Sequence, residues 1–333
     1  RSKKSSKDLE NKVNQFNQDV EMRKNIRMSD VTFYDYSQAW VKVYKAEKES
    51  NTQAMYKNII DKHFVALKGV KLQDIGRVHY QMLMTNACDK KRTQQQIKLT
   101  FKQVLRSAVS DRLFAANVME DIFNNMDTIK YKPTEKRPLM DYEQKALFAA
   151  ELSTQDRAFV YILYGCGLRR GEVLPLTKFD VDLKRRTLTV NKAIGFVNDK
   201  PVPKGPKTDN GYRTVPIPAV VFPVIEAYVK SLKRPQLFVM RNGRPVTKSS
   251  YDKMWARIIK AMQAVSEEQI AGLTAHVFRH NYCTNLCYQI PMISIKKIAE
   301  MLGDTERMVM EVYNHIVLDK EDAAGAADKA FEM

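Results

Sequence analysis

A basic segment with two prolines, IKYKPTEKRP at residues 129–138, most constrains the fold because it separates two stretches of different periodicity. Proline interrupts helices and strands, and such a polar segment has little to bury in a core. A length of 333 residues is typical of roughly two domains. We predict a lead-in at 1–28, a helical domain at 29–128, a basic linker at 129–138, a mixed domain at 139–317 and a tail at 318–333.

The part before the linker has the periodicity of amphipathic helices. FYDYSQAWVKVY places Phe33, Tyr36, Trp40 and Tyr44 on one face. TQQQIKLTFKQVLRSAVSDRL, residues 93–113, shows the clearest apolar stripe and predicts a long helix packed into a core. That stripe consists of Ile97, Phe101, Leu105 and Ala108.

The part after the linker mixes helical and strand patterns. DYEQKALFAA predicts a helix with Asp141 as N-cap and Gln144 as its capping-box partner. A strongly apolar helix then ends at a Gly-Cys-Gly break. RRTLTVNKAI and YRTVPIP are β-rich and enclose a stretch of turn residues, which predicts a small sheet with a long hairpin loop. The fold class is therefore mainly α with a small antiparallel β-sheet, α+β.

The chain carries a large positive charge. It has 55 Lys plus Arg against 38 Asp plus Glu, a formal net charge of +17. Such an excess favours a polyanionic partner, nucleic acid ahead of a membrane surface. No apolar run approaches the ~20 residues that cross a bilayer, and the basic N-terminus has no apolar stretch behind it.

One basic row stands out within residues 93–113. Lys98, Lys102 and Arg106 recur every four residues on one side of the expected helix, and no acidic residue lies four positions from any of them. Such a row is usually a solvated face, but a phosphate backbone would relieve the repulsion. Both interpretations stay open for the row alone. The candidate DNA-binding residues are this row and the linker residues Lys130, Lys132, Lys136 and Arg137.

The four cysteines do not form a dense disulfide framework, and reduced thiols of a cytosolic protein fit better. His280, Cys283 and Cys287 have helical spacing, but no fourth ligand has a matching spacing. We therefore expect no metal and no other cofactor. The chain also has no phosphate-binding loop of the Walker type and no cluster of carboxylates suited to a two-metal nuclease.

The polar residues left for chemistry are mostly basic, a set suited to holding a phosphate and stabilising extra negative charge on it. They are Arg169, Arg170, Lys207, Arg213, His276, Arg279, His280 and His315, with Tyr313 late in the chain.

Four motifs in order resemble the tyrosine recombinases, a family that includes phage integrases of the lambda type and integrases of conjugative transposons. The motifs are GCGLRRGEVLPL, KTDNGYRTVPIP, HVFRHNYCT and LGDTERMVMEVYNHI. The resemblance covers residues 136–316 and, more loosely, the helical part before them. It implies a two-domain DNA clamp, with a core-binding domain followed by a catalytic domain. The lysine-rich character and the tail favour a conjugative transposon origin over a phage origin.

The resemblance also implies the roles of single residues. Arg169 and Arg279 match the two catalytic arginines, His276 the histidine of the His-x-x-Arg pair, and Tyr313 the nucleophile. Lys207 matches the lysine of a β-hairpin. Glu172 matches the acidic residue that often supports the first arginine. His280 and Asp304 are further candidates for supporting these groups, and a purely structural role stays open for His280.

The chemistry of these roles follows from the side chains themselves. Two guanidinium groups can hold the non-bridging oxygens of a phosphodiester and stabilise a five-coordinate phosphorus. A phenol is protonated at neutral pH and needs a base or a positive field, for which His276 is the candidate. The deoxyribose 5′-oxygen needs a proton donor, for which Lys207 is the candidate. Arg170 is adjacent to Arg169, and spacing favours Arg169.

Asp304 is the point of departure from the family. Members usually carry His or Trp after the Leu-Gly pair, whereas a carboxylate there would repel the scissile phosphate. Asp304 follows Gly303 and precedes a helix, so we expect it to cap that helix. Holding His276 or an arginine in place is the other structural role.

We expect a site-specific recombinase that integrates and excises a mobile element through a phosphotyrosine on Tyr313 and a Holliday junction. The expected partners are double-stranded DNA, a homotetramer on that DNA, a C-terminal tail docked in trans, and an accessory DNA-bending or excision factor. The expected place is the bacterial cytoplasm, at nucleoid DNA. Two alternatives are a DNA-binding protein with an inactive site and a nicking-closing enzyme like the type IB topoisomerases.

Overall fold

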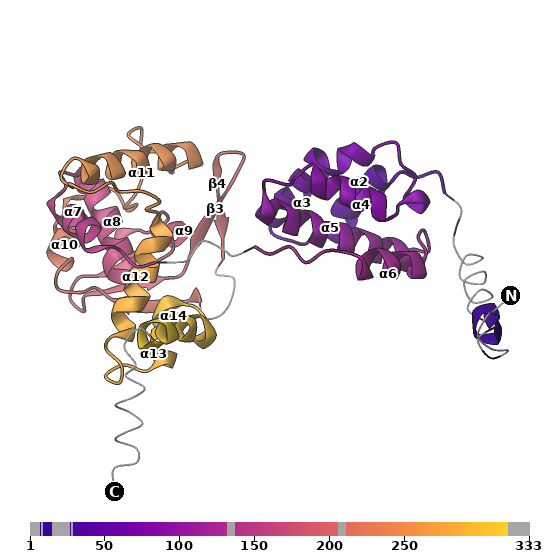
Figure 1. Cartoon of the computed structure of the whole chain (residues 1–333). Helices are drawn as coiled ribbons and strands as arrows, with labels where there is room; N and C mark the ends of the chain where they lie inside the picture. Colours follow the sequence, from indigo (N-terminus) through magenta and orange to yellow (C-terminus); the bar gives the residue numbers. More distant parts are fainter. Residues whose placement is uncertain are drawn as a thin grey trace, which may run out of the picture. The chain divides into compact units, whose positions relative to one another are not determined.

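The computed structural model describes residues 7, 9–14, 27, 29–131, 137–205 and 211–318, with only the backbone from residue 315 on. The chain divides into two compact units, Arg1–Thr134 and Glu135–Met333 (Figure 1). This division falls inside the segment predicted to be a linker. Each unit has its own buried apolar cluster.

The regular elements described in the first unit are helices, with one isolated β-bridge between Thr32 and Lys71. Its elements are α2 (Phe33–Tyr44), α3 (Ser50–Lys62), η1 (Phe64–Leu67), η2 (Leu72–Asp74), α4 (Arg77–Thr85), α5 (Lys91–Ser110) and α6 (Ala116–Asn124). The predicted stripe of α5 is confirmed, because Ile97, Phe101, Leu105 and Ala108 are fully buried. Of the predicted face of α2, only Tyr44 is exposed, and its hydroxyl donates to Asp111.

The second unit contains eight α-helices, one 3-10 turn and five strands among its described residues. The helices are α7 (Asp141–Ala149), α8 (Thr154–Cys166), α9 (Arg170–Val173), α10 (Phe222–Ser231), α11 (Lys248–Gln263), α12 (Ala275–Cys287), α13 (Ile295–Leu302) and α14 (Glu306–Leu318), with the 3-10 turn η3 (Lys178–Asp180). The strands are β1 (Val181–Asp182), β2 (Thr187–Val190), β3 (Ala193–Val197), β4 (Lys200–Lys204) and β5 (Arg213–Pro216).

The strands form two small antiparallel sheets. One has the order β1-β2-β5, with Leu188 opposite Val215 and Val190 opposite Arg213. The pairing of RRTLTV with YRTVPIP is therefore as predicted. The stretch between them was expected to be one long loop, but it contains a second sheet, the hairpin β3-β4. Two prolines in β4 lowered the strand signal there, although proline is tolerated in a strand at a sheet edge.

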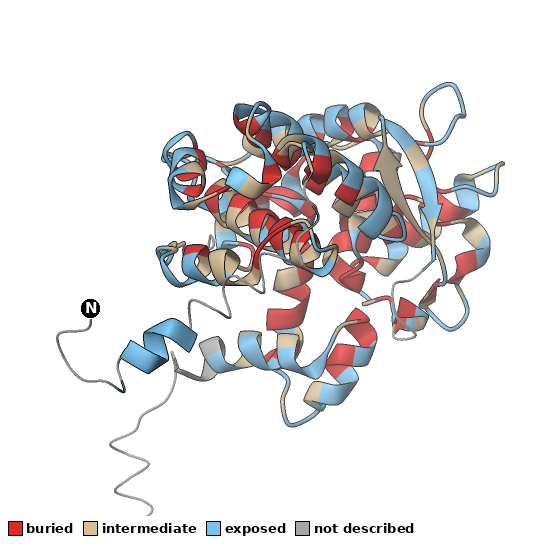
Figure 2. Cartoon of the chain, turned by 90° about the vertical axis from the view of Figure 1, so that its right-hand side faces the viewer, coloured by how far each residue is buried: buried red, intermediate tan, exposed pale blue. Residues whose placement is uncertain are grey.

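Of the nine helical segments named for this unit, η3 is a 3-10 turn and the other eight are α-helices. The most deeply buried of them is α8, in which Phe159 and Ile162 are fully covered. Most helices of the chain carry both buried and exposed residues (Figure 2), as expected where only one face of a helix packs into a core. A helix that is apolar on most of its sides belongs in the middle of a core, as the sequence of α8 predicted.

The start of α7 differs from the prediction by one residue. The N-cap is Met140 rather than Asp141, and the carboxylate of Glu143 accepts the Met140 amide hydrogen at 2.9 Å. Gln144 therefore does not complete the cap. The fold class predicted from the sequence, mainly α with small antiparallel sheets, is confirmed.

Candidate active site

Arg169 lies where the chain turns from α8 into α9. Gly167 ends α8 with a φ of +62°, in the left-handed region. A Cβ at this glycine would lie 2.2 Å from the ring of Tyr282, so only glycine fits. The turn places Arg169 at the N-cap of α9, where the Glu172 carboxylate accepts from its amide nitrogen at 2.9 Å and from its Nη1 at 3.1 Å.

The neighbouring Arg170 has a different environment. Its guanidinium lies over the ring of Tyr251, 4.7 Å from the centroid, and 5.5 Å from that of Phe196. Arg169 instead donates from Nη2 to Asp304, which also binds Arg279. The geometry therefore supports the choice of Arg169 over Arg170 as the candidate phosphate-binding arginine.

Arg213 holds Glu172 from the opposite side. This arginine, on β5, donates to the two carboxylate oxygens of Glu172 at 2.7 and 3.3 Å, and its Nε donates to the Met301 carbonyl at 2.8 Å. The side chains of Arg213 and Glu172 are 5% and 9% exposed. Burial alone would raise the pKa of Glu172, but the hydrogen bonds and charge of Arg213 outweigh it and lower the pKa.

Arg213 was grouped with the basic residues available for chemistry but was given no role, although the sequence contains a signal for one. Strand residues two apart share a face, so in RTVPIP the residue Arg213 lies on the same face as Val215, which is buried. An arginine on the buried face of a strand needs a carboxylate partner. That partner is Glu172, 41 residues earlier in the chain.

Arg279 is the more deeply buried of the two predicted catalytic arginines. Its side chain is 5% exposed, and it donates to the Gly167 carbonyl at 3.0 Å and to Asp304 Oδ2 at 2.9 Å. Burial and the nearby charge of Arg169 lower its pKa to about 10. Arg279 therefore stays a cation at neutral pH.

Asp304 does not cap the following helix, so the capping prediction is wrong. Helix α14 begins at Glu306, and Thr305 accepts the Met308 amide hydrogen instead. The Asp304 Oδ2 atom accepts from Arg169 and Arg279 at 3.0 and 2.9 Å. The alternative role, contact with an arginine, agrees with this geometry. Burial would raise the pKa of Asp304, but the bond to Arg279 and the surrounding arginine charge lower it.

Two histidines and the candidate nucleophile lie on neighbouring helices. His276 is in the first turn of α12 and exposed, whereas His280 is half-buried. Tyr313 lies on α14, which packs against α12 and α13, and its half-buried ring contacts the apolar core. The fold therefore brings the Tyr313 helix against the helices that carry or adjoin His276, Arg279 and Asp304.

Several predicted residues lie outside the part of the chain that the structure describes. These are Lys207, Lys132, Lys136, the side chain of His315 and the tail from residue 319. Their predicted roles stay predictions.

The basic row on α5 packs partly against the protein itself. Lys98 Nζ donates to the Asp127 carbonyl at 2.6 Å. Lys102 and Arg106 lie over the ring of Phe123, at 4.8 and 5.6 Å from its centroid. Burial, together with the charges of Lys98 and Arg106, lowers the pKa of Lys102. Arg106 is the exposed member of the row and the one best able to reach a phosphate.

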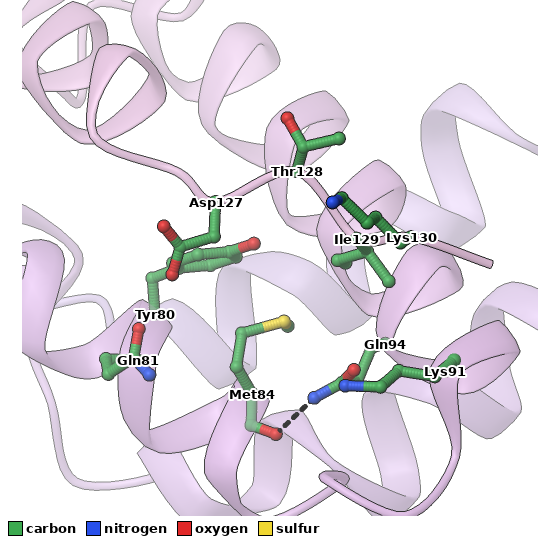
Figure 3. Close-up of a pocket in the computed structure, with 9 residues that line it drawn as sticks. All are labelled: Tyr80, Gln81, Met84, Lys91, Gln94, Asp127, Thr128, Ile129 and Lys130. Atoms are coloured by element: carbon green, nitrogen blue, oxygen red, sulfur yellow. Dashed lines mark hydrogen bonds between the residues drawn. The ribbon is translucent and has the colours of Figure 1, made fainter.

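Two linker residues have specific surroundings. Lys130 lines a surface cavity of about 330 Å³ within the first unit, between α4, α5 and residues 127–130 (Figure 3). Arg137, a candidate DNA-binding residue of the linker, forms two 2.6 Å bonds from its guanidinium to Glu143, which is fully buried. An arginine that neutralises a buried carboxylate is part of the fold. Contact between Arg137 and DNA stays a prediction.

Among the described residues, no group of three or more His, Cys, Asp or Glu side chains is placed to hold a metal ion. Cys166, Cys283 and Cys287 are buried thiols and Cys88 is exposed. No helix in the described ranges is long and apolar enough to cross a membrane.

Comparison with known proteins identifies the family. The model of the phage integrase family matches residues 131–319, and that of the phage integrase N-terminal SAM-like domain matches residues 32–86. The chain belongs to the phage integrase family. A tyrosine recombinase XerC-like protein of Caldanaerobacter subterraneus subsp. tengcongensis is 23% identical over 94% of this chain and 87% of its own length. These matches confirm the predicted resemblance and the enzyme class, a tyrosine recombinase.

Other relatives match over about half of their length. The transposase from transposon Tn916 of Enterococcus faecalis is 25% identical over 54% of this chain and 47% of its own. Among solved structures, the Tn1549 transposon integrase in complex with transposon right end DNA has a TM-score of 0.73 at 20% identity, covering 91% of this chain and all of that one. A lambda integrase tetramer bound to a Holliday junction has a TM-score of 0.64 at 17% identity, covering 88% and 80%. These similarities show the shared fold.

Proposed function

We propose that this chain is a site-specific DNA recombinase that integrates and excises a mobile element through a covalent bond between Tyr313 and a DNA 3′-phosphate. The observation that carries the proposal is the convergence of Arg169 and Arg279 on one oxygen of Asp304. Guanidinium groups arranged in this way fit the non-bridging oxygens of a phosphodiester. They stabilise the charge that grows on those oxygens as phosphorus becomes five-coordinate.

The reaction is a transesterification. The Tyr313 oxygen forms a bond to phosphorus, the bond from phosphorus to the 5′-oxygen breaks, and the leaving oxygen takes up a proton. His276 takes the role of base for the phenol, and Lys207 that of proton donor. Attack by the 5′-hydroxyl of a second strand then forms a new phosphodiester and frees the tyrosine. The number of phosphate esters is conserved, so ATP is not consumed, and arginines provide the charge stabilisation that metal ions give elsewhere.

The proposed partner is double-stranded DNA, which the net charge of +17 supports. Strand exchange between two duplexes requires two active sites on each, so we propose a homotetramer that passes through a Holliday junction. The structural neighbour from lambda is a tetramer on such a junction. Docking of the C-terminal tail on a neighbouring subunit, and an accessory bending or excision factor, belong to the same proposal.

A suicide substrate tests the covalent step. DNA sites are first selected from a random duplex pool by the Tyr313→Phe protein, and a nick is then placed next to the cleaved phosphate so that the short product diffuses away. We expect a covalent adduct in EDTA and without ATP for the native protein and for Tyr288→Phe, a matched control on the end of α12. Tyr313→Phe should form none. Absence of an adduct with the native protein would leave only the alternative of a DNA-binding protein with an inactive site.

Exchange between two differently labelled duplexes separates the remaining rivals. A recombinase joins label from one duplex to the other, whereas a nicking-closing enzyme relaxes supercoiled DNA and returns each strand to its own partner. Relaxation without exchange by a protein that forms the Tyr313 adduct would favour the topoisomerase-like alternative.

A further inference from the structure

Asp304 makes an unusual contact for a residue beside a phosphate site. One oxygen of its carboxylate, Oδ2, accepts from Nη2 of Arg169 and from Nη2 of Arg279. The other oxygen accepts the amide hydrogen of Thr305 at 3.1 Å. A single anionic oxygen between two guanidinium groups is the arrangement that a non-bridging phosphate oxygen would take up. The Asp304 side chain is 28% exposed and that of Arg169 is 43% exposed, so this position can be reached from solvent.

The two arginines do not depend on Asp304 for their positions. Arg169 also donates to the Gly303 carbonyl, at 3.2 Å from both Nη1 and Nη2, and to Glu172. Arg279 also donates to the Gly167 carbonyl. Each guanidinium therefore keeps an acceptor of its own when the Asp304 carboxylate is removed. A role limited to holding the arginines would be redundant.

The charges within this cluster point the same way. Arg169, Arg213 and Arg279 contact the two carboxylates Glu172 and Asp304, so three positive groups face two negative ones. One phosphodiester anion would bring this cluster to neutrality with Asp304 in place, and the additional charge of the transition state would make it negative. With Asp304 turned away from the arginines, the same cluster could accommodate both charges.

The backbone at Asp304 allows such a turn without rearrangement of the fold. Gly303 ends α13 in the left-handed region, with φ of +62°, and the Asp304 amide donates to the Ala299 carbonyl at 3.0 Å. These bonds fix the main chain, so only the side-chain dihedral angles of Asp304 have to change.

We propose that Asp304 is an internal competitor for the scissile phosphate: its carboxylate occupies the phosphate position between Arg169 and Arg279 in the DNA-free protein and is displaced when DNA binds. This inference rests on the proposed function of the site. It makes Asp304 a determinant of how tightly the reacting phosphate is held. It also assigns a role to the residue that departs from the family pattern.

Inorganic phosphate is a direct probe of the position, because it needs neither a known DNA sequence nor a reactive tyrosine. Its binding is titrated by calorimetry and by ³¹P NMR to the native protein and to Asp304→Asn, which keeps the shape and removes the charge. We expect about tenfold tighter binding to the variant, since one like charge at contact distance is removed. The gain should disappear when Arg169→Ala is added. Glu300→Gln is the matched control: it removes an exposed carboxylate that pairs with Lys297, and should leave the affinity unchanged.

Equal phosphate affinity of the native protein and Asp304→Asn would overturn the proposal, and weaker binding by the variant would show that the carboxylate organises the site instead. Asp304→Ser, which can still accept from Thr305, replaces the asparagine variant if that one does not fold. The phosphate titration is independent of the Tyr313 adduct assay. Failure of the proposed function and failure of this inference are therefore distinguishable.

Discussion

The buried pair of Arg213 and Glu172 gives the sharpest stability prediction. Arg213→Met keeps most of the side-chain volume but removes the guanidinium that faces both Glu172 oxygens. The Met301 carbonyl loses a donor at the same time. Breaking a buried ion pair from one side costs about 3–5 kcal/mol, because the other charge stays buried. Glu172 keeps its bonds to Arg169, so we expect the lower end, about 3 kcal/mol.

The pH dependence of this loss has a definite sign. Arg213 lowers the pKa of Glu172 in the folded protein, so the stabilisation is complete above the ordinary pKa of a glutamate and is lost as pH falls through the lowered value. Without Arg213, only Arg169 opposes the effect of burial on the pKa of Glu172. The Glu172 carboxyl group of the folded variant therefore takes up a proton at a higher pH than that of the native protein. The difference between native protein and Arg213→Met should therefore shrink as pH falls from neutral to about 4.

The assay must report the second unit alone, since the chain has two units. The two tryptophans are Trp40 in the first unit and Trp255 in the second. A Trp40→Phe background leaves Trp255, which is packed against Phe278, as the fluorescent reporter of urea unfolding. Adding Glu172→Gln to Arg213→Met removes the unpaired buried charge and should recover more than half of the loss. A loss below about 1 kcal/mol, or a double variant no more stable than the single one, would refute this reasoning.

Two further substitutions test the fold around the site. Arg137→Met should lower the free energy of unfolding of the second unit by about 3 kcal/mol, because it leaves the fully buried Glu143 without its cation. An unchanged urea midpoint together with weaker DNA binding would contradict this role and favour DNA contact by Arg137. Gly167→Ala should lower the free energy of unfolding by more than about 2 kcal/mol, because the new Cβ would overlap the Tyr282 ring and the residue has a positive φ. In a Tyr282→Ala background the overlap is absent, so the same substitution should cost less. An equal cost in both backgrounds would contradict the explanation.

Local patterns predicted the parts of the fold that local forces determine. The buried stripe of α5 and the glycine end of α8 follow from helical periodicity and from the left-handed backbone that glycine tolerates. The hairpin β3-β4 was missed because Pro201 and Pro203 weaken the strand pattern, although each simply faces a residue of β3 across a two-stranded sheet.

Pairings between distant residues could not be read in the same way. Glu172 meets Arg213 only because the fold brings a side chain of α9 to a side chain of β5, and Asp304 meets Arg279 only because α13 lies against α12. The sequence identified most of these residues as chemically interesting. It did not show which carboxylate belongs to which arginine, and so a helix cap was assigned to a residue that binds two guanidinium groups.

The two glycines that end helices also supply the acceptors that hold the arginines. The last carbonyls of a helix have no partner within it and lie at the negative end of its dipole, where a cation is favoured. The carbonyl of Gly167, after α8, accepts from Arg279, and the carbonyl of Gly303, after α13, accepts from Arg169. Each arginine is thus anchored by the end of a helix other than its own. Because these bonds come from the main chain, they persist whichever side chain or phosphate occupies the position of Asp304, and that constancy is what allows a carboxylate and a phosphodiester to compete for it.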